Sequence, residues 1–337
     1  MKPRLAILGA TGAVGTLLCR LLAERNFPFE SIRFFGSPSG GEGRRIDFRG
    51  RSLPVEPLVR DRIRKIDLAI ASTPDEVAAE CAPWIVDQGG VMVDESAAHR
   101  MHSHVPLVIP EINPQAIEHH QGIIASPNCS TTQLAICLKP LHDHCGIERA
   151  VVSTYQAASG AGQAALQELI DGTRAKLDHQ DFSHHQFESP LPLNLWPKIG
   201  RMMPDDSTSE ETKMVLETRK ILADEALRMC VTCVRVPVLN CHSESVVIET
   251  KQPVTPQQAR ELFEQSAGIS ILDDPAELQL PTPQGSNDHD DVFVGRIRRD
   301  LSVENGLAFW CVSDNLRKGA ATNAVQIAEL LVEGQRL

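Results

Sequence analysis

A glycine-rich turn near the N-terminus constrains the fold of this chain more than any other feature. Residues 5–8 form a short apolar run, which is typical of a buried parallel strand. The turn GATGAVG, from Gly9 to Gly15, follows, and leucines then recur at helical spacing. Such a turn lets backbone N–H groups approach a pyrophosphate at the positive end of a helix. The spacing GxxGxxG differs from the commoner GxGxxG, and a close helix–strand crossing that requires glycine is the alternative interpretation.

Strands and helices alternate after this turn, up to about residue 129. The apolar runs predict strands at 32–35, 67–71, 91–94 and 123–125, with a helix at 76–87. This alternation predicts βαβ units and a parallel sheet. We therefore expect an α/β fold that begins with a Rossmann-like dinucleotide-binding domain.

The second half of the chain has a different sequence pattern, in which longer runs of β-branched residues lie between helical patterns. The expected strands are 150–155, 230–238, 244–250, 292–294 and 307–312. The expected helices are 132–140, 162–177, 210–222 and 323–333. Residues 179–208 are rich in His, Pro and Asn, and we expect an extended excursion there. This half is therefore predicted to be a separate α+β domain, with the boundary near Cys129.

Length and charge limit the classes of protein to which the chain can belong. A chain of 337 residues exceeds one ordinary domain. The net charge of −11 and an aromatic content of 4% argue against a nucleic-acid or anionic membrane partner. The nine cysteines are odd in number and no targeting segment is visible, which predicts reduced thiols and a cytoplasmic protein. Cys230 and Cys233 form a CxxC without a second pair, so we expect no metal site.

The segment after the second expected strand bears on the choice of cofactor. Sites selective for NAD carry an acidic residue about 20 residues after the glycine-rich turn. Residues 35–39 (FGSPS) contain none, and Arg44 and Arg45 follow. Ser37, Ser39 and Arg44 are therefore candidates for binding a 2′-phosphate, which favours NADP. A solvated loop is the alternative.

Cys129 is the candidate nucleophile. It lies in SPNCSTTQ, residues 126–133, between an expected strand and an expected helix. A helix N-terminus lowers the pKa of a thiol, and its unpaired N–H groups can bind an oxyanion. A buried structural cysteine is the alternative. A thiol nucleophile also needs a base, and His242 is one candidate among twelve histidines.

Several motifs together resemble the aspartate-β-semialdehyde dehydrogenase family. The resemblance runs nearly end to end. Its segments are GATGAVG at 9–15, SPNCSTTQ at 126–133, TYQAASGAG at 154–162, EETKMVLETRKIL at 210–222, CVRVPV at 233–238 followed by His242, VGRIRRD at 294–300, and DNLRKGAATNAVQIAELL at 314–331. The order of the SPNCST and CVRVPV–His elements is specific to this family.

The resemblance implies an activity and a set of functional residues. The reaction would interconvert L-aspartate 4-semialdehyde, phosphate and NADP⁺ with L-4-aspartyl phosphate and NADPH, in lysine, threonine and methionine biosynthesis. Cys129 would be the nucleophile, His242 the general acid/base, and Gln156 would orient the substrate. Substrate and phosphate would be bound by Arg235, Glu210, Lys213, Arg100 and Asn128. The cofactor would contact Gly9, Thr11, Gly12, Ala13, Val14, Gly15, Ser37, Ser39, Arg44, Ser159, Gly160, Asn315 and Gly319.

The resemblance also implies a domain arrangement and an oligomeric state. An NADP-binding domain would span 1–129 and be completed by the C-terminal helix, about 315–337. A catalytic and dimerisation domain would span 130–314. The protein would be a homodimer or homotetramer.

The chain departs from the family pattern in two places. Pro38 stands where the family commonly has an arginine, which leaves the 2′-phosphate contact to Arg44. In residues 94–100 (DESAAHR), Glu95, Ala97 and His99 replace common family residues. Glu95 adds a negative charge near the expected phosphate and cofactor sites.

Two other functions are compatible with the sequence. One is a related acyl-phosphate reductase of the N-acetyl-glutamyl-phosphate type. The other is a non-catalytic paralogue that acts as a binding protein. The presence of Cys129, Gln156, Arg235 and His242 together favours an enzyme.

Overall fold

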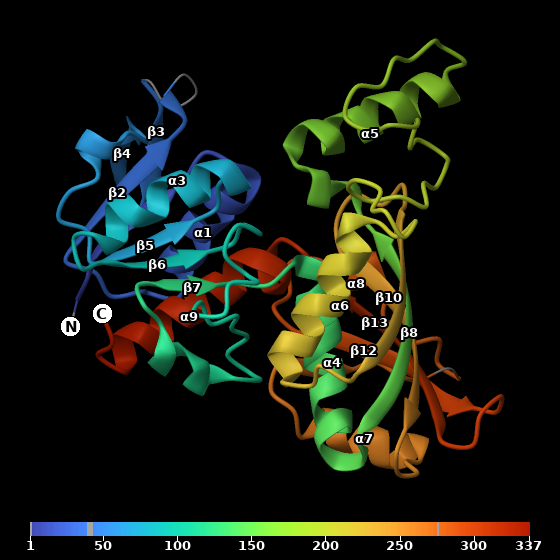
Figure 1. The fold of residues 1–337 in the computed structure, drawn as a ribbon. Coiled ribbons are helices and arrows are strands. Elements are labelled where there is room, and N and C mark those ends of the chain that lie inside the picture. Colours follow the sequence, from blue (N-terminus) through green and yellow to red (C-terminus); the bar gives the residue numbers. More distant parts are fainter. Residues whose placement is uncertain (1, 39–42, 275) are drawn as a thin grey trace. The chain divides into compact units, whose positions relative to one another are not determined.

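The chain folds into two compact units. The computed structural model describes residues 2–38, 43–274 and 276–337 (Figure 1). The first unit comprises Met1–Asn128 and Ala320–Leu337, and the second comprises Cys129–Gly319. Ser39, a predicted cofactor contact, lies outside the described residues.

A seven-stranded sheet forms the centre of the first unit, as far as the described residues show. Its strand order is β3-β4-β2-β1-β5-β6-β7. β3 is antiparallel to β4, and every other neighbouring pair is parallel. The strands are β1 (Arg4–Leu8), β2 (Ser31–Gly36), β3 (Arg45–Phe48), β4 (Arg51–Pro57), β5 (Leu68–Ala71), β6 (Val91–Asp94) and β7 (Ile123–Ala125).

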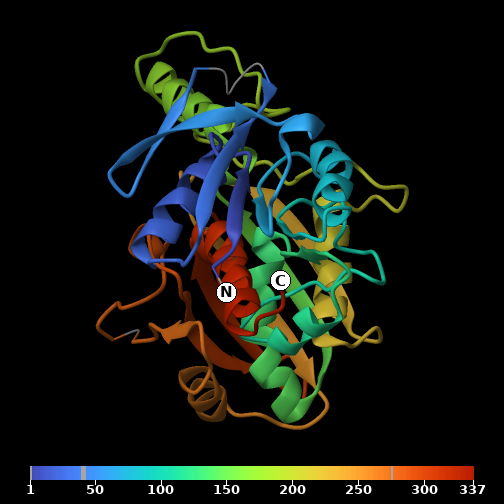
Figure 2. The same cartoon turned by 90° about the vertical axis from the view of Figure 1, so that its left-hand side faces the viewer.

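Helices cover both faces of this sheet, which explains why its strands are continuously apolar. Leu5 and Ile7 of β1 belong to a core cluster shared with α1 (Ala13–Glu24) and α9 (Thr322–Glu333). Ala6 and Leu8 belong to a second cluster shared with α3 (Asp75–Val86). Figure 2 shows α9 in red beside α1 in blue. Burial on both sides of β1 thus follows from the period-2 geometry of a strand.

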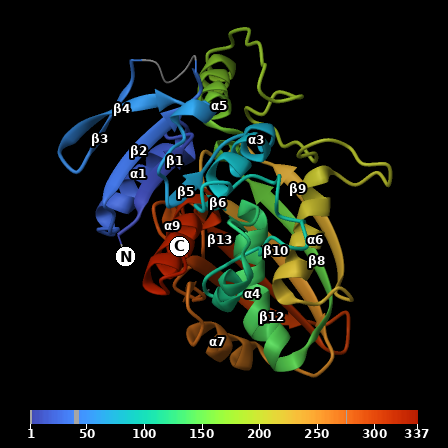
Figure 3. The same ribbon diagram turned by 60° about the vertical axis from the view of Figure 1, so that its left-hand side comes forward.

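A six-stranded mixed sheet forms the centre of the second unit, again within the described residues. Its order is β11-β12-β13-β10-β8-β9. The strands are β8 (Ile147–Gln156), β9 (Arg228–Arg235), β10 (His242–Thr250), β11 (Ile269–Ile271), β12 (Val292–Asp300) and β13 (Gly306–Ser313). The helices are α4 (Cys129–Cys145), α5 (Gln163–Leu177), α6 (Ser209–Leu222), α7 (Pro256–Glu264) and α8 (Pro283–Ser286). α4 and α6 pack together on one side of the sheet (Figure 3).

The register of two parallel strands places two functional candidates side by side. β8 and β9 pair along their length, and the last pair is Gln156 with Arg235. Parallel strands end at the same edge of a sheet. Both side chains therefore lie at the carboxyl edge of this strand pair.

The expected elements are present, but sequence patterns missed a hairpin and, among other short elements of the described chain, α7, α8 and β11. The hairpin consists of β3 and β4, and β4 contains Pro54 and Pro57, which argue against a strand. β3 is the edge strand and β4 lies between β3 and β2, but each proline is paired on one side only, Pro54 with β3 and Pro57 with β2. α7 was missed although Thr255 and Pro256 give it a capping box and a proline in its first turn. β11 is only three residues long.

Among the helices that the structure describes, none combines the length and the apolar character needed to cross a membrane.

The packing of α9 generates a stability prediction for the first unit. Ile327 is fully buried in the cluster that α9 shares with β1 and α1. Ile327→Ala should lower the free energy of unfolding of this unit by about 2–5 kcal/mol, because the change removes buried methylene groups and leaves a cavity. Urea denaturation measures the difference. The control Glu333→Ala, at an exposed position of the same helix, should stay within about 0.5 kcal/mol of wild type. Equal midpoints for the two variants would contradict this packing.

Candidate active site

Cys129 is the first residue of α4 in the second unit. The first N–H groups of a helix have no partner within the helix, and the helix dipole favours a negative charge there. Both effects favour the thiolate form of a half-buried cysteine. A Cβ on Gly319 would come within 2.8 Å of the Cβ of Cys129. Any side chain at position 319 would therefore displace the thiol.

Arg235 lies at the end of β9, next to Gln156. Its Nη1 donates a hydrogen bond of 2.6 Å to the carbonyl oxygen of Ala157. Burial lowers the pKa of Arg235, and the charges of Cys129 and Glu210 oppose this effect. A guanidinium stays protonated in proteins, so the site holds a buried positive charge near the thiol.

His242 is the first residue of β10, the strand beside β8. Its Nδ1 accepts a hydrogen bond of 3.1 Å from the backbone N–H of Ala157. Burial lowers the pKa of His242 well below its ordinary value, and the charge of Arg235 lowers it further. His242 is therefore neutral near pH 7. Because Nδ1 is the acceptor, its ring proton lies on Nε2.

Nε2 of His242 is buried and has no hydrogen-bond partner within the described part of the chain. A Cβ on Gly160 would lie 3.1 Å from this Nε2 and 3.1 Å from Nη1 of Arg235. The imidazole N–H and the guanidinium thus border the same glycine. A buried donor without a protein partner is costly, so this N–H is suited to a substrate oxygen.

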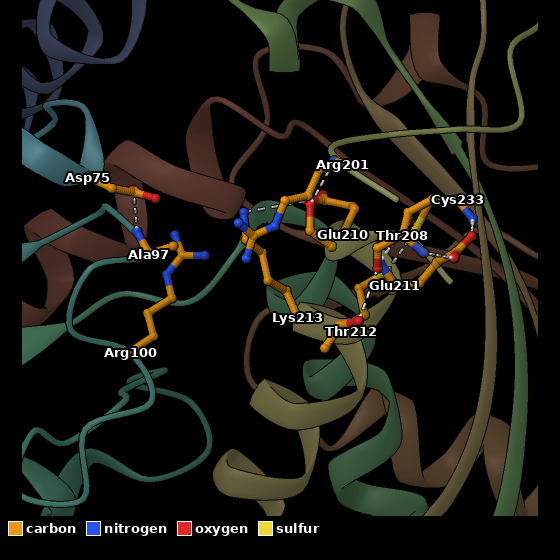
Figure 4. Close-up of polar contacts among 12 residues, drawn as sticks. Asp75, Ala97, Arg100, Arg201, Thr208, Glu210, Glu211, Thr212, Lys213 and Cys233 are labelled. Carbon is orange, nitrogen blue, oxygen red and sulfur yellow. Dashed lines mark hydrogen bonds and ion pairs between the residues drawn. The ribbon is translucent and has the colours of Figure 1, made fainter. Parts of the chain in front are cut away.

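Glu210 connects Gln156 to α6. The side-chain amide of Gln156 donates a hydrogen bond of 3.1 Å to Oε1 of Glu210. Oε2 of Glu210 lies 3.9 Å from Nζ of Lys213, one turn along the helix (Figure 4). The two residues thus form an i,i+3 pair on one face of α6, and the buried Glu210 also contacts the end of β8.

A capping box fixes the start of α6 and so the position of Glu210. The hydroxyl of Thr208 accepts from the N–H of Glu211, and the carboxylate of Glu211 accepts from the N–H of Thr208. The same carboxylate also accepts a hydrogen bond of 2.9 Å from the backbone N–H of Cys233 in β9 (Figure 4). The helix start is thereby attached to the strand that carries Arg235.

Asn315 and Ser159 hold the loops around His242. Nδ2 of Asn315 donates to Oγ of Ser159 at 3.0 Å, and its Oδ1 accepts from the N–H of Cys241 at 3.0 Å. Oγ of Ser159 also donates to Oδ1 of Asn240 at 2.8 Å. Both residues were predicted to contact the cofactor, and both make these hydrogen bonds within the protein.

The glycine-rich turn lies in the first unit, at the carboxyl end of β1. Gly9 has φ +79°, and a Cβ there would overlap the carbonyl oxygen of Ser72. Gly12 caps α1 without a side chain, and Ala13 and Val14 begin the helix. A cavity of about 650 Å³ is lined by Gly9, Thr11, Gly12 and Ser37 among others. The volume of this cavity and the glycine backbone in its lining fit one half of a dinucleotide.

Arg44 borders a different cavity of the first unit. That cavity has a volume of about 660 Å³, and Thr11, Arg20 and Arg45 also line it. Neither Ser37 nor Pro38 belongs to its lining. The structure therefore does not bring Arg44 and Ser37 to one cavity.

Arg100 and Asn128 also belong to the first unit. Nε of Arg100 donates to the carbonyl of Ser126 at 2.9 Å, and Nη2 donates to the carbonyl of Glu95 at 2.6 Å. Burial raises the pKa of Glu95 to about 8, although the charge of Arg100 opposes this. Glu95 is therefore mostly protonated at pH 7. The extra negative charge that the sequence suggested here is largely absent below pH 8.

Sequence reasoning missed two features beside the predicted site residues. One is the backbone of Ala157, which carries no side-chain signal. The other is Glu244, which is fully buried two residues after His242. Burial raises the pKa of Glu244 to about 8, opposed by the neighbouring polar side chains of Gln133 and Cys311, of which Cys311 Sγ donates to Oε2 of Glu244. The sequence signal for this buried acid was the position of Glu244 in an expected strand, on the side that faces the core.

No group of three or more His, Cys, Asp or Glu side chains suited to a metal ion occurs in residues 2–38, 43–274 and 276–337.

Comparisons with known proteins point to one family. Residues 4–120 match the model "Semialdehyde dehydrogenase, NAD binding domain", and residues 138–318 match "Semialdehyde dehydrogenase, dimerisation domain". The chain is 44% identical to the aspartate-semialdehyde dehydrogenase of Aquifex aeolicus, over 99% of each chain. It is 45% identical to that of Synechocystis, over 98% of this chain and 97% of the relative. A crystal structure of aspartate semialdehyde dehydrogenase II from Vibrio cholerae, complexed with ASA, matches with a TM-score of 0.96 at 40% identity, over 99% of each chain.

Glu244 provides a pH-dependent test of this environment. The folded protein keeps the proton up to about pH 8, whereas the unfolded chain ionises near the ordinary glutamate pKa of about 4.3. Wild-type stability should therefore fall, relative to Glu244→Gln, as pH rises through this window, and the difference should level off above pH 8. Melting temperatures of both proteins from pH 5 to 9 measure it. A difference that stays constant or shrinks with rising pH would show that Glu244 ionises normally.

Proposed function

The chain belongs to the aspartate-semialdehyde dehydrogenase family, as its motifs predicted, and on this basis we propose its reaction and the roles of its residues. The reaction is the reversible, NADP-dependent conversion of L-aspartate 4-semialdehyde and phosphate to L-4-aspartyl phosphate. The observation that carries the proposal is the group formed by Cys129, Arg235 and His242 around Gly160 and Gly319. This group combines a thiol, a fixed cation and a neutral imidazole donor.

The thiolate of Cys129 starts the reaction by adding to the aldehyde carbon. A C–S bond forms, and the electron pair of the C=O bond moves onto oxygen as an alkoxide. When bound, NADP⁺ supplies the acceptor for the hydride that leaves this carbon. The product on the protein is a thioester of Cys129. A phosphate oxygen then attacks the thioester carbonyl, the C–S bond breaks, and the thiolate returns.

His242 acts on the substrate oxygen. Its Nε2–H donates a hydrogen bond to the alkoxide as charge develops there. The N–H of Ala157 occupies Nδ1, so Nε2–H faces the substrate oxygen and stabilises the alkoxide by hydrogen bonding while the proton stays on the ring. The general acid/base role of His242 uses the other tautomer, in which Nδ1 carries the ring proton, and Nε2 takes the proton of the Cys129 thiol and later returns it. In the reverse direction the same N–H stabilises the thioester oxygen as the hydride arrives.

Charged side chains hold the substrate and the phosphate. The N–H groups of Arg235 other than the one bound to Ala157 suit the planar α-carboxylate. Glu210 binds the α-amino group, and the amide of Gln156 fixes both the carboxylate of Glu210 and the substrate. The phosphate is held by Lys213, Arg100 and Asn128.

NADP binds along the glycine-rich turn of the first unit. The contacts on that turn and after β2 are Gly9, Thr11, Gly12, Ala13, Val14, Gly15 and Ser37. The residues that would hold the nicotinamide end are Ser159, Gly160, Asn315 and Gly319. Gly9, Thr11, Gly12 and Ser37 line the cavity of about 650 Å³, which supports this assignment.

The assembly and location of the enzyme complete the proposal. The protein is a homodimer or homotetramer built mainly on the second unit, whose matching family model is a dimerisation domain. It is cytoplasmic and binds neither nucleic acid nor membrane. The nine free cysteines and the net charge of −11 support these assignments.

Cys129 is the first residue to test. Cys129→Ala should abolish phosphate-dependent NADPH formation from aspartate semialdehyde, because no other group forms the thioester. Absorbance of NADPH follows the reaction. Cys230→Ala, at an exposed position of β9, is the matched control and should keep wild-type turnover. Substantial turnover by Cys129→Ala would refute the mechanism. The same assay with the glutamyl homologue of the substrate distinguishes the related reductase activity.

Arg235 tests the binding of the α-carboxylate. Arg235→Lys keeps a positive charge but loses the planar fork, so kcat/KM for aspartate semialdehyde should fall by about tenfold or more. Steady-state kinetics at saturating phosphate measure it. Arg228→Lys, which pairs with the exposed Glu148 at the other end of β9, should leave kcat/KM unchanged. A kcat/KM for Arg235→Lys equal to that of wild type would remove Arg235 from the substrate site.

A further inference from the structure

The cavity of about 650 Å³ in the first unit has a wall that the glycine-rich turn does not predict. β4 runs parallel to β2, so both strands end at the same edge of the sheet. The turn after β4 brings Leu58, Val59 and Arg60 to the cavity, which Ser37 after β2 also lines. Helix α3 closes another side with Trp84.

Backbone hydrogen bonding attaches this turn to the end of β2. The N–H of Leu58 donates a hydrogen bond of 2.9 Å to the carbonyl oxygen of Gly36. Gly36 directly precedes Ser37, at the end of the second strand, where dinucleotide folds recognise the adenosine ribose. Arg60 therefore lies only two residues after Leu58, whose backbone is hydrogen-bonded to the end of β2 where the ribose is expected to bind.

Arg60 is the one cation among the described residues that line this cavity, and Glu80 is the one acid. Pro38 is also in the lining and carries no charge. Arg44, the arginine that the sequence favoured, lines the other cavity with Arg20 and Arg45. The positive charge that a 2′-phosphate needs is therefore supplied at this cavity by the turn after β4.

The ion pair of Arg60 leaves it able to turn toward a ligand. Its Nη2 lies 3.8 Å from Oδ2 of Asp87, and both side chains are mostly exposed, at 72% and 65%. Exposed pairs of this length contribute little, because water screens both charges. A doubly charged phosphate is a stronger partner for a guanidinium than one distant carboxylate.

We propose that Arg60 binds the 2′-phosphate of NADP and sets the preference for NADP over NAD. The proposal rests on the cofactor assignment made above. It locates the specificity in the turn after β4, whereas the family pattern locates it in the loop after β2.

Calorimetry of the full chain measures the Kd of cofactor fragments, and so tests the role of Arg60 independently of catalysis. The probes are 2′,5′-ADP, which carries the 2′-phosphate, and 5′-AMP, which lacks it. Wild type should bind 2′,5′-ADP more tightly. Arg60→Ala should weaken 2′,5′-ADP about tenfold or more and change 5′-AMP by less than about twofold, because only the charge-assisted contact is lost.

Two further variants sharpen the test. Arg64→Ala is the matched control, because Arg64 borders a neighbouring small cavity with Arg60 but does not line the nucleotide cavity. It should bind both probes as wild type does. Asp87→Asn removes the competing carboxylate of Arg60, so it should tighten 2′,5′-ADP and leave 5′-AMP unchanged.

Three results would overturn the assignment. If Arg60→Ala weakened both probes equally, Arg60 would contact the shared adenosine part. If Arg44→Ala lost the preference for 2′,5′-ADP while Arg60→Ala kept it, the phosphate would bind on the side of Arg44. If wild type bound neither probe, the proposed function would fail, and this assignment would fail with it.

Discussion

The peptide groups of one residue, Ala157, organise the catalytic unit. The N–H of Ala157 donates to Nδ1 of His242, and its carbonyl accepts from Arg235. The first bond places the imidazole proton on Nε2, and the second fixes the guanidinium. The charge of Arg235 and the burial of the ring then keep His242 neutral. Backbone geometry thus determines the ring proton of His242 and the orientation of both side chains, which are the groups proposed to act on substrate.

The sheet makes this arrangement possible. Ala157 directly follows β8, which is flanked by β10 and by the parallel β9. Residues distant in sequence therefore meet at one edge because of strand register. The capping box of α6 adds Glu210 to the same edge, and Gly160 and Gly319 leave room for the imidazole and the thiol. The glycine-rich turn proposed to bind the cofactor belongs to the other unit, where Gly9 and Gly15 pack against backbone.

Sequence patterns predicted most of this fold, because its strands are buried and its helices are periodic. The position of Cys129 at a helix start also followed from local sequence. His242 could not be chosen from chemistry alone, since its partner is a backbone group and its neighbours arrive through strand pairing. The family resemblance supplied that choice. The hairpin of β3 and β4 was missed because its prolines disfavour a strand, and with it the contribution of Arg60 to the nucleotide cavity. The protonation of Glu95 depends on burial, which composition does not reveal.

The proposed reaction depends on a thioester of Cys129. Mass spectrometry of the enzyme mixed with aspartate semialdehyde and NADP⁺, without phosphate, tests this most directly. We expect one aspartyl acyl group on the peptide that contains Cys129, and its loss when phosphate is added. NADPH formation without any acylated Cys129 peptide, or acylation that persists in phosphate, would contradict it.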